Sequence, residues 1–210
     1  MNHIILAGDS IFDNAAYVNQ GQSVIEQLNR QSSNETKSTL LAIDGAVTAD
    51  LSNQLKHLPL DTTHLFISSG GNDALNAAYL LSEKVSNVFE AMSVFSNVIE
   101  TFQDQYREIL RLATSQIKNV VVCTIYDSIP GYDKEPLIAL KLFNEVILRE
   151  AFSLGLPVLD LRLVFNDPAD YSDISPIEPS AQGGEKIVRS IINILQKQNF
   201  SSDMSSIWLN

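Results

Sequence analysis

The sequence predicts an α/β fold, a single three-layer α/β/α domain with a five-stranded parallel sheet. Short apolar runs of strand length alternate along the chain with segments of helical periodicity, which is typical of a parallel sheet covered by helices on both faces. Turn residues, several of them glycine, directly follow these runs. The length of 210 residues suits one well-buried domain, which we place at residues 1–198, with a C-terminal tail at 199–210.

Each expected strand is an apolar run bounded by turn residues, and the five runs are 4–7, 38–43, 65–68, 120–126 and 157–161. Helical spacing predicts helices at 23–31, at a short segment around Leu51 and Leu55, at 136–154 and at 181–198. A longer helical region, 73–116, is expected to break near 82–86, and we interpret its apolar stripe from Phe89 to Leu112 as core. The Ser-rich tail is either loose or holds Trp208 against the surface.

Charge and composition exclude several classes of function. The formal net charge of −11 argues against binding to nucleic acid or to an anionic membrane surface, because both require basic patches. No segment approaches the roughly 20 apolar residues of a membrane-spanning helix. The N-terminal apolar run lacks a basic flank and leads directly into the candidate site, so we expect no signal peptide and a cytoplasmic location. The one cysteine, Cys123, lies in an apolar run and is expected in the core.

The first apolar run ends at the tripeptide Gly8-Asp9-Ser10. In open parallel sheets, ligands bind outside the carboxyl ends of the strands, so the Ser10 hydroxyl is expected at the edge where chemistry takes place. The tripeptide alone would also fit an ordinary turn. Two other strand ends carry related residues, because Asp44-Gly45 follows the second strand and Gly70-Gly71-Asn72-Asp73 follows the third.

In order and spacing, these blocks resemble the SGNH (GDSL-type) hydrolase superfamily, over nearly the whole chain. The resemblance implies a flavodoxin-like fold and an ester hydrolase in which Ser10 is the nucleophile. It also implies that the backbone N–H groups of Ser10 and Gly45 and the side-chain amide of Asn72 form an oxyanion hole. A turn and a helix cap would explain Asn72-Asp73 without any catalytic role, and a plain turn would explain Gly45. A small-molecule ester is the expected partner, and no cofactor or metal ion is expected.

The fourth block of that family, Asp-x-x-His before the last helix, is altered in this chain. Glu178 stands in the place of the histidine and Ser175 in the place of the aspartate. The three histidines, His3, His57 and His64, fall at the amino ends of the expected strands, His3 and His64 roughly 15–20 Å from the site. Glu178 is therefore the candidate base.

A carboxylate with an ordinary pKa of about 4.3 is a weak base for a serine hydroxyl. Burial would raise the pKa of Glu178, and a second acid such as Asp173 or Asp9 would share its proton. We expect the ionisation that controls activity to lie below the imidazole range. The alternative is that Glu178 only binds the Ser10 hydroxyl or caps the final helix, and that the protein hydrolyses little.

Further polar side chains are expected near the strand ends, as substrate-binding groups or as loop residues and caps: Asp9, Asp13, Asn14, Asp73, Asp127 and Arg162. Three functions remain open from the sequence. The first is hydrolysis of small acyl or acetyl esters by Ser10. The second is a catalytically silent protein of this fold that binds a small acylated or sugar-like ligand. The third is a scaffold whose long helix, from Phe89 to Gln116, contacts a partner.

Overall fold

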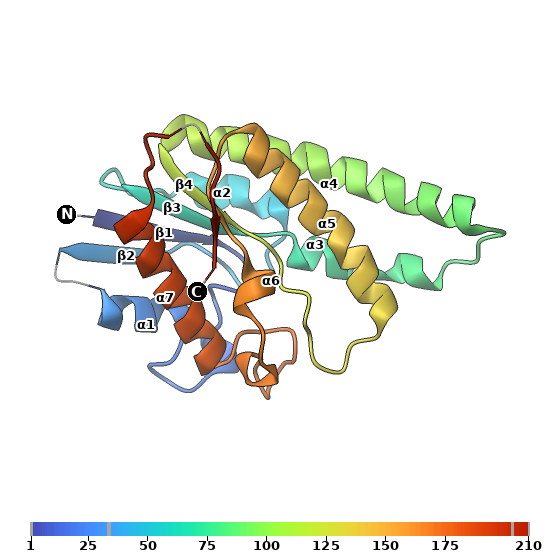
Figure 1. The fold of residues 1–210 in the computed structure, drawn as a ribbon, viewed down its shortest axis with the longest axis horizontal. Helices are drawn as coiled ribbons and strands as arrows, with labels where there is room; N and C mark the ends of the chain where they lie inside the picture. Colours follow the sequence, from blue (N-terminus) through green and yellow to red (C-terminus); the bar gives the residue numbers. More distant parts are fainter. Residues whose placement is uncertain (1, 33–34, 203, 210) are drawn as a thin grey trace.

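Six parallel strands form the central sheet of the computed structural model, which describes residues 2–32, 35–202 and 204–209 (Figure 1). The strands are β1 (Asn2–Gly8), β2 (Thr36–Leu40), β3 (His64–Ser68), β4 (Asn119–Cys123), β5 (Val158–Leu159) and β6 (Ile207–Trp208). Their order across the sheet is β2-β1-β3-β4-β5-β6. The predicted α/β fold with a parallel sheet is confirmed, and the predicted strand count of five is one too low.

The additional strand lies in the C-terminal tail. Ile207 and Trp208 pair in parallel with the two residues of β5, and the indole N–H of Trp208 donates to Gln198 Oε1 (2.9 Å). The Asp160 N–H continues the ladder by donating to the carbonyl of Trp208 (3.0 Å). A strand of two residues is too short to show a period-2 pattern, so the tail carried no sequence signal for it.

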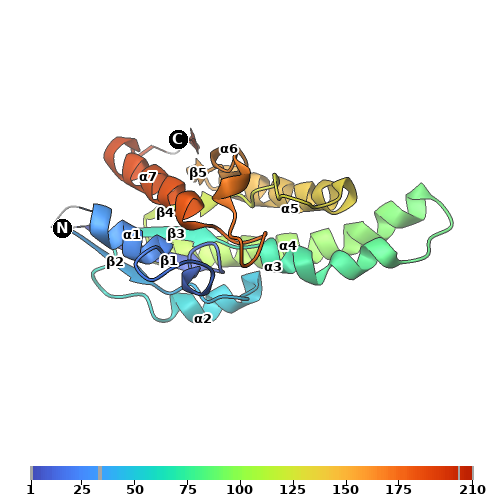
Figure 2. The same ribbon diagram turned by 90° about the horizontal axis from the view of Figure 1, so that it is seen from below.

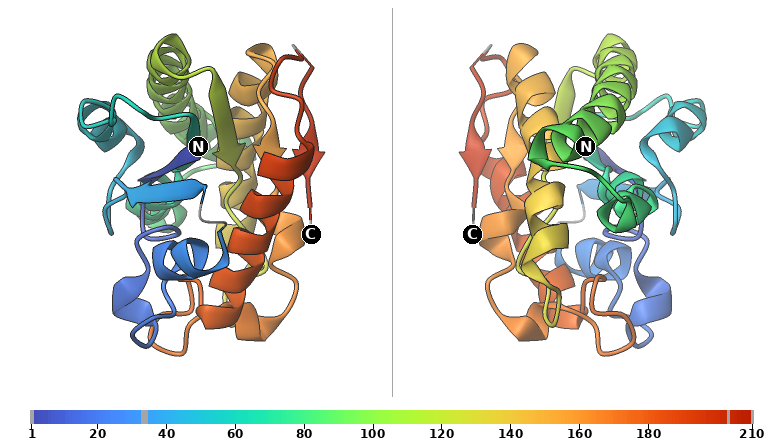
Figure 3. Two further views of the ribbon diagram at one scale, coloured as in Figure 1. Left: turned by 90° about the vertical axis from the view of Figure 1, so that its left-hand side faces the viewer. Right: turned by 90° about the vertical axis from the view of Figure 1, so that its right-hand side faces the viewer.

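Helices cover both faces of the sheet (Figure 3). One face packs against α1 (Val24–Gln31), α6 (Leu161–Val164) and α7 (Ala181–Lys197), and the other against α2 (Leu51–Leu55), α4 (Val88–Gln116) and α5 (Lys134–Ser153). Successive strand residues point to opposite faces, so Ile5 and Leu65 belong to the α4–α5 core and Ile4 and Phe66 to the α1–α7 core. No helix of the described chain is both long and apolar enough to cross a membrane.

The helical region predicted at 73–116 breaks where it was expected to break. It consists of α3 (Gly71–Asn76), the 3-10 helix η3 (Ala78–Ser82) and then α4. The inner part of α4 is core, with Phe102 and Tyr106 buried. Its outer turns project beyond the body of the domain (Figures 1 and 2), where Val88, Phe89 and Met92 are 75%, 82% and 56% exposed. The core interpretation is therefore wrong for the start of the stripe, which is an exposed apolar patch of the kind that a scaffold would need, and for Leu112 at its end, which is also exposed.

The strand order places the ends of β1, β2 and β3 together. From β1 the chain crosses to β2 on one side and then returns to β3 on the other, so the topological switch point lies between β1 and β3. At such a point the loops after the strands separate and leave a crevice at the carboxyl edge. Ser10 and Gly45 lie in the loops after β1 and β2, and Asn72 lies in the first turn of α3, which follows β3.

β1 and β3 approach each other closely at Gly8. Its φ is +131°, and a Cβ at this position would lie 1.7 Å from the carbonyl oxygen of Ser68, so only glycine fits. That carbonyl accepts the Asp9 N–H (3.1 Å). The buried amide of Gln54 binds both the N–H and the carbonyl of Gly8 (2.7 and 2.8 Å). The backbone that precedes Ser10 is thereby fixed on both sides.

Candidate active site

A pocket of about 230 Å³ opens at the carboxyl edge of the sheet. Four of the predicted site residues line it: Asp9, Ser10, Asn72 and Glu178. Ser10 and Glu178 are each only 6% exposed. The fold thus brings together side chains from the loop after β1, from the start of α3 and from the segment before α7.

Ser10 lies in a tight turn directly after β1. The carbonyl of Asp9 accepts the N–H groups of Phe12 and Asp13 (3.1 Å each), and Asp9 Oδ1 accepts the Ile11 N–H (3.2 Å). Within the described residues, the Ser10 N–H donates to no protein acceptor. The turn therefore leaves both the hydroxyl and the N–H of Ser10 available at the pocket.

Asn72 connects the loop after β3 to the loop after β2. It lies at the start of α3, just after Gly70 (φ +114°), and its Nδ2 donates to the carbonyl of Ala46 (2.9 Å). This bond holds the turn that contains Gly45 (φ +79°) beside α3. In the part of the chain that the structure describes, the second Nδ2 hydrogen of Asn72 has no acceptor and is available to a substrate oxygen. Gly45 itself is exposed and does not line the pocket, but within the described chain its N–H has no protein acceptor.

Replacing Asn72 by alanine is expected to lower kcat by roughly 10²–10³, with a smaller change in KM, because the donated bond strengthens only as negative charge develops on the substrate oxygen. Steady-state kinetics with an aryl ester measure the split. Asn76→Ala, on the exposed end of the same helix, is the matched control and should leave both constants unchanged. A change confined to KM would assign Asn72 to substrate binding.

The segment 171–179, here called the Glu178 loop, holds Glu178 over the pocket. The carbonyl of Glu178 accepts the Ser172 N–H (2.8 Å). The fully buried Asn14 donates from Nδ2 to the carbonyl of Pro179 (3.1 Å) and accepts the Val24 N–H at Oδ1 (2.8 Å). Asn14 therefore ties the loop after the nucleophile to the residue next to Glu178.

The Glu178 carboxyl lies in a poorly solvated position against Ser10. Burial raises its pKa to about 7, while a hydrogen bond with the Ser10 side chain acts in the opposite direction and the charge of Asp44 adds to the rise. Among the described residues, Glu178 Oε2 is buried and has no hydrogen-bond partner. A carboxyl with a pKa near 7 and a free oxygen is suited to accept and return a proton at neutral pH.

Asp9 is the second acid at the site. Its side chain is buried, and its pKa rises to about 8, mainly through burial and further through the charges of Glu178 and Asp73. Two neighbouring buried carboxyls resist simultaneous ionisation. Of the two proton-sharing acids considered from the sequence, Asp9 lies at the pocket, whereas Asp173 is exposed.

Two other predicted site residues bind backbone around the pocket. Asp13 Oδ2 accepts the Asp44 N–H (3.0 Å), which joins the loops after β1 and β2. Asp73 Oδ2 accepts both the N–H and the hydroxyl of Thr48 (3.0 Å each), and its pKa is raised by burial. Neither side chain lines the pocket. Their partners give them a role in holding the loops in place.

Arg162 and Asp127 also lie outside the pocket lining. Arg162 forms a two-pronged ion pair with Asp160 (2.7 and 2.6 Å), which also accepts the Thr124 hydroxyl (2.9 Å). Asp127 is half-buried in the loop after β4. The hydrogen bond to Asp160 raises the pKa of the Arg162 guanidinium, and the negative charge of Asp127 adds to this rise.

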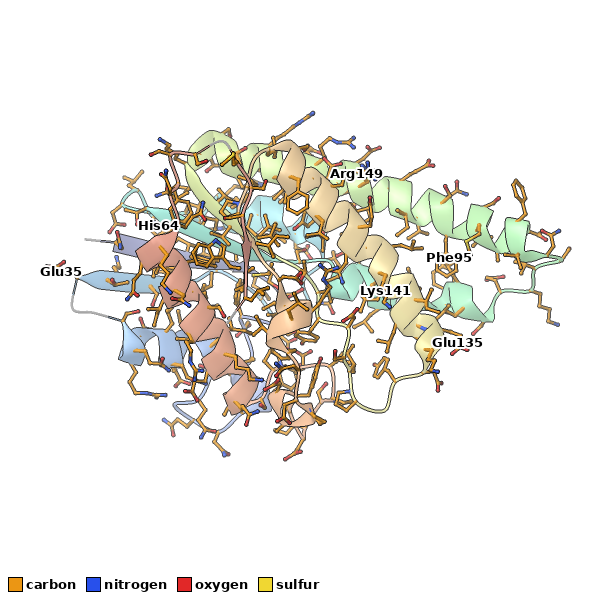
Figure 4. The ribbon with its side chains drawn as sticks, viewed as in Figure 1. Glu35, His64, Phe95, Glu135, Lys141 and Arg149 are labelled. Carbon is orange, nitrogen blue, oxygen red and sulfur yellow. The ribbon has the colours of Figure 1, made fainter. Side chains whose placement is uncertain are left out.

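The histidines lie far from the pocket, as the strand assignments predict. His3 binds Asp61 (2.8 Å) at the start of β1, and His64 packs edge-on against Phe200 at the start of β3. His57 is exposed after α2. Figure 4 shows His64 and Phe95, a pocket residue, toward opposite ends of the molecule. None of the three histidines, all in the described chain, lines the pocket.

The apolar part of the pocket was not predicted from the sequence. It includes Leu81 from η3, Phe95 from α4 and Tyr132 from the loop before α5. Phe95 belongs to the stripe interpreted as core, and periodicity alone does not separate a pocket wall from a core face. Cys123 is buried as predicted, and burial raises the pKa of its thiol. No metal-binding cluster of His, Cys, Asp or Glu is found among the described residues.

Comparisons with known proteins agree with this geometry. The model of the GDSL-like lipase/acylhydrolase family matches residues 6–186. No curated protein matches the chain. Solved structures with the same fold include an extracellular lipase from Streptomyces rimosus, which is 19% identical with a TM-score of 0.63, the match covering 92% of this chain and 99% of the lipase.

Two further structures show the same fold. An α/β hydrolase enzyme from the metagenome of Lake Arreo is 15% identical, with a TM-score of 0.70 and coverage of 94% of this chain and 96% of that one. A variant of an acetyl xylan esterase from Geobacillus stearothermophilus is 14% identical, with a TM-score of 0.64 and coverage of 91% and 93%. With the family match spanning most of its length, the chain belongs to the GDSL-like lipase/acylhydrolase family and is a carboxylic ester hydrolase with an α/β fold.

Proposed function

We propose that the protein hydrolyses esters through a covalent acyl intermediate on Ser10, with Glu178 as the general base. The observation that carries the proposal is the convergence of Ser10, Asn72 and Glu178 on one pocket at the switch point of the sheet. Ser10 supplies the nucleophile, Asn72 a donor for the developing oxyanion, and Glu178 a buried carboxyl that lines the same pocket. The backbone N–H groups of Ser10 and Gly45 would complete the oxyanion hole.

In the acylation half, the Ser10 Oγ attacks the ester carbonyl carbon while its proton passes to the Glu178 carboxylate. The carbonyl oxygen takes the negative charge and is stabilised by the three donors. When the tetrahedral intermediate collapses, the bond to the alkoxy oxygen breaks, and Glu178 returns the proton to the leaving alcohol. The products of this half are the alcohol and an acyl ester of Ser10.

In the deacylation half, water takes the position that the alcohol has left. Glu178, again ionised, accepts a proton from this water as its oxygen attacks the acyl carbon. Collapse of the second intermediate returns that proton to Ser10 Oγ and releases the carboxylic acid. Asp9, which is neutral near pH 7 because its pKa is raised to about 8, adds no second negative charge beside the carboxylate.

The sequence predicts esters of small acyl groups as substrates. Their p-nitrophenyl esters suit a test of the intermediate, because the leaving group p-nitrophenol is coloured and its release can be followed directly. We expect a burst of about one p-nitrophenol per protein before the steady state, and an adduct of one acyl group on Ser10 in an acid-quenched sample. Mass spectrometry locates the adduct. Ligand binding without turnover and without an adduct would favour the catalytically silent alternative.

A further inference from the structure

The pocket continues well beyond the catalytic groups. We infer that it holds an extended aliphatic chain of the ester, longer than an acetyl group; this inference rests on the proposed function and concerns the same pocket. Among the described residues, the charged, amide and serine side chains that line it are Asp9, Ser10, Asn72 and Glu178, which meet at the Ser10 end. Apart from the hydroxyls of two tyrosines, the rest of the wall is aliphatic, aromatic, glycine or proline.

The character of this wall limits what binds there. Leu81, Phe95, Leu137, Leu140 and Phe143 contribute from three different helices, and no lysine, arginine or histidine of the described chain lines the pocket. A sugar ring placed among these side chains would lose its hydrogen bonds to water without replacement, which is costly. An alkyl chain loses none and gains from leaving water. The apolar wall therefore disfavours a sugar-like ligand, which was one of the alternatives that the sequence analysis retained.

The size of the pocket points the same way. Its volume of about 230 Å³ greatly exceeds the roughly 10–15 Å³ that one water molecule requires by the same kind of measure. One wall runs along α3, where Asn72, Ala74 and Leu75 line the pocket, and continues through Ala77 and Ala78 to Leu81 of η3. An acetyl group held at Ser10 would leave most of this length empty. Small side chains at Gly71, Ala74 and Ala78 keep it open.

The outer wall suggests the variant that tests the inference. Ala78 lines the pocket far from Asn72 and is partly open to solvent, so a phenylalanine there would shorten the pocket without overpacking the core. Ala49 lies in another 3-10 helix, η2 (Thr48–Asp50), is also exposed and does not line the pocket. Ala49→Phe is therefore the matched control for Ala78→Phe.

The experiment measures kcat/KM along two series, p-nitrophenyl esters from acetate to decanoate and alkyl acetates from methyl to decyl. In the wild type, kcat/KM should rise up to about fourfold per methylene along one series until the pocket is full. A rise with the p-nitrophenyl esters assigns the pocket to the acyl chain, and a rise with the alkyl acetates assigns it to the alkoxy chain. Ala78→Phe should end the rise at a shorter chain, and Ala49→Phe should not.

A second measurement does not depend on turnover. The neutral ketone 2-octanone should raise the Tm of wild type and of Ser10→Ala, and acetone at equal concentration should not; Ala78→Phe should lose this shift. Stabilisation by 2-octanone in a protein that hydrolyses no ester would contradict the proposed function and support the aliphatic pocket. A preference for the shortest ester in both series (p-nitrophenyl acetate and methyl acetate), with no shift from 2-octanone, would overturn the inference.

Discussion

Ser10→Ala is expected to lower kcat for a p-nitrophenyl ester by at least about 10⁴, because it removes the atom that forms the covalent intermediate. The oxyanion donors remain, so a small residual rate above that of water is expected. The fold should be unaffected, since the turn at Ser10 is held by the Asp9 carbonyl and by Gly8, not by the Ser10 hydroxyl. Steady-state rates and thermal unfolding of the variant check both expectations.

Ser128→Ala is the control for this prediction. Ser128 lies in the loop after β4, is exposed and does not line the pocket, so its loss should leave the rate unchanged. Wild-type turnover in Ser10→Ala would show that Ser10 is not the nucleophile. Loss of the burst together with loss of the steady-state rate in Ser10→Ala alone is the expected outcome.

The positions of Ser10 and Asn72 were predictable because each depends on a local pattern. An apolar run followed by Gly8-Asp9-Ser10 ends a strand wherever that strand lies, and the same holds for the run before Gly70. Parallel strands then bring their carboxyl ends to one edge without further information. The conformation at Gly8 was not predicted, but its φ of +131° is one that glycine adopts without strain.

The surroundings of the site were less predictable because they depend on contacts between distant segments. Asp73 and Arg162 were expected near the substrate, but Thr48 and Asp160 occupy their side chains. The apolar wall forms where η3, α4 and α5 meet, and the stripe that contains Phe95 has the same period whether it faces core or pocket. Contacts between distant segments of this kind cannot be recognised from the sequence of either segment alone.

Glu178→Gln is expected to lower kcat by roughly 10²–10⁴, the usual contribution of a general base, while KM changes little. Glutamine keeps the shape and the hydrogen-bonding reach of Glu178 but does not accept the Ser10 proton. Glu185→Gln is the matched control, because Glu185 is an exposed glutamate on α7 and lies outside the pocket lining. It should retain the wild-type rate.

The dependence of the wild-type kcat/KM on pH should be that of a carboxylate base with a raised pKa. Only ionised Glu178 accepts a proton, so kcat/KM should climb about tenfold per pH unit below pH 7 and level off above it, since the pKa of Glu178 is about 7. The sequence predicted that the pKa controlling activity lies below the imidazole range. In the structure, burial of Glu178 raises this pKa to about 7, near that range. The residual rate of Glu178→Gln should show no such step.

The dependence of stability on pH tests the raised pKa of the Glu178 carboxyl independently of activity. Because the pKa of Glu178 rises from 4.5 to about 7 on folding, the folded state binds more protons than the unfolded state between these values. The contribution of Glu178 to stability therefore falls as pH increases through this window. Thermal unfolding should show Glu178→Gln gaining Tm relative to wild type from pH 5 to pH 8. A gain in Tm with an unchanged rate would place Glu178 beside the substrate but outside the chemistry, and would favour a protein that binds esters without hydrolysing them.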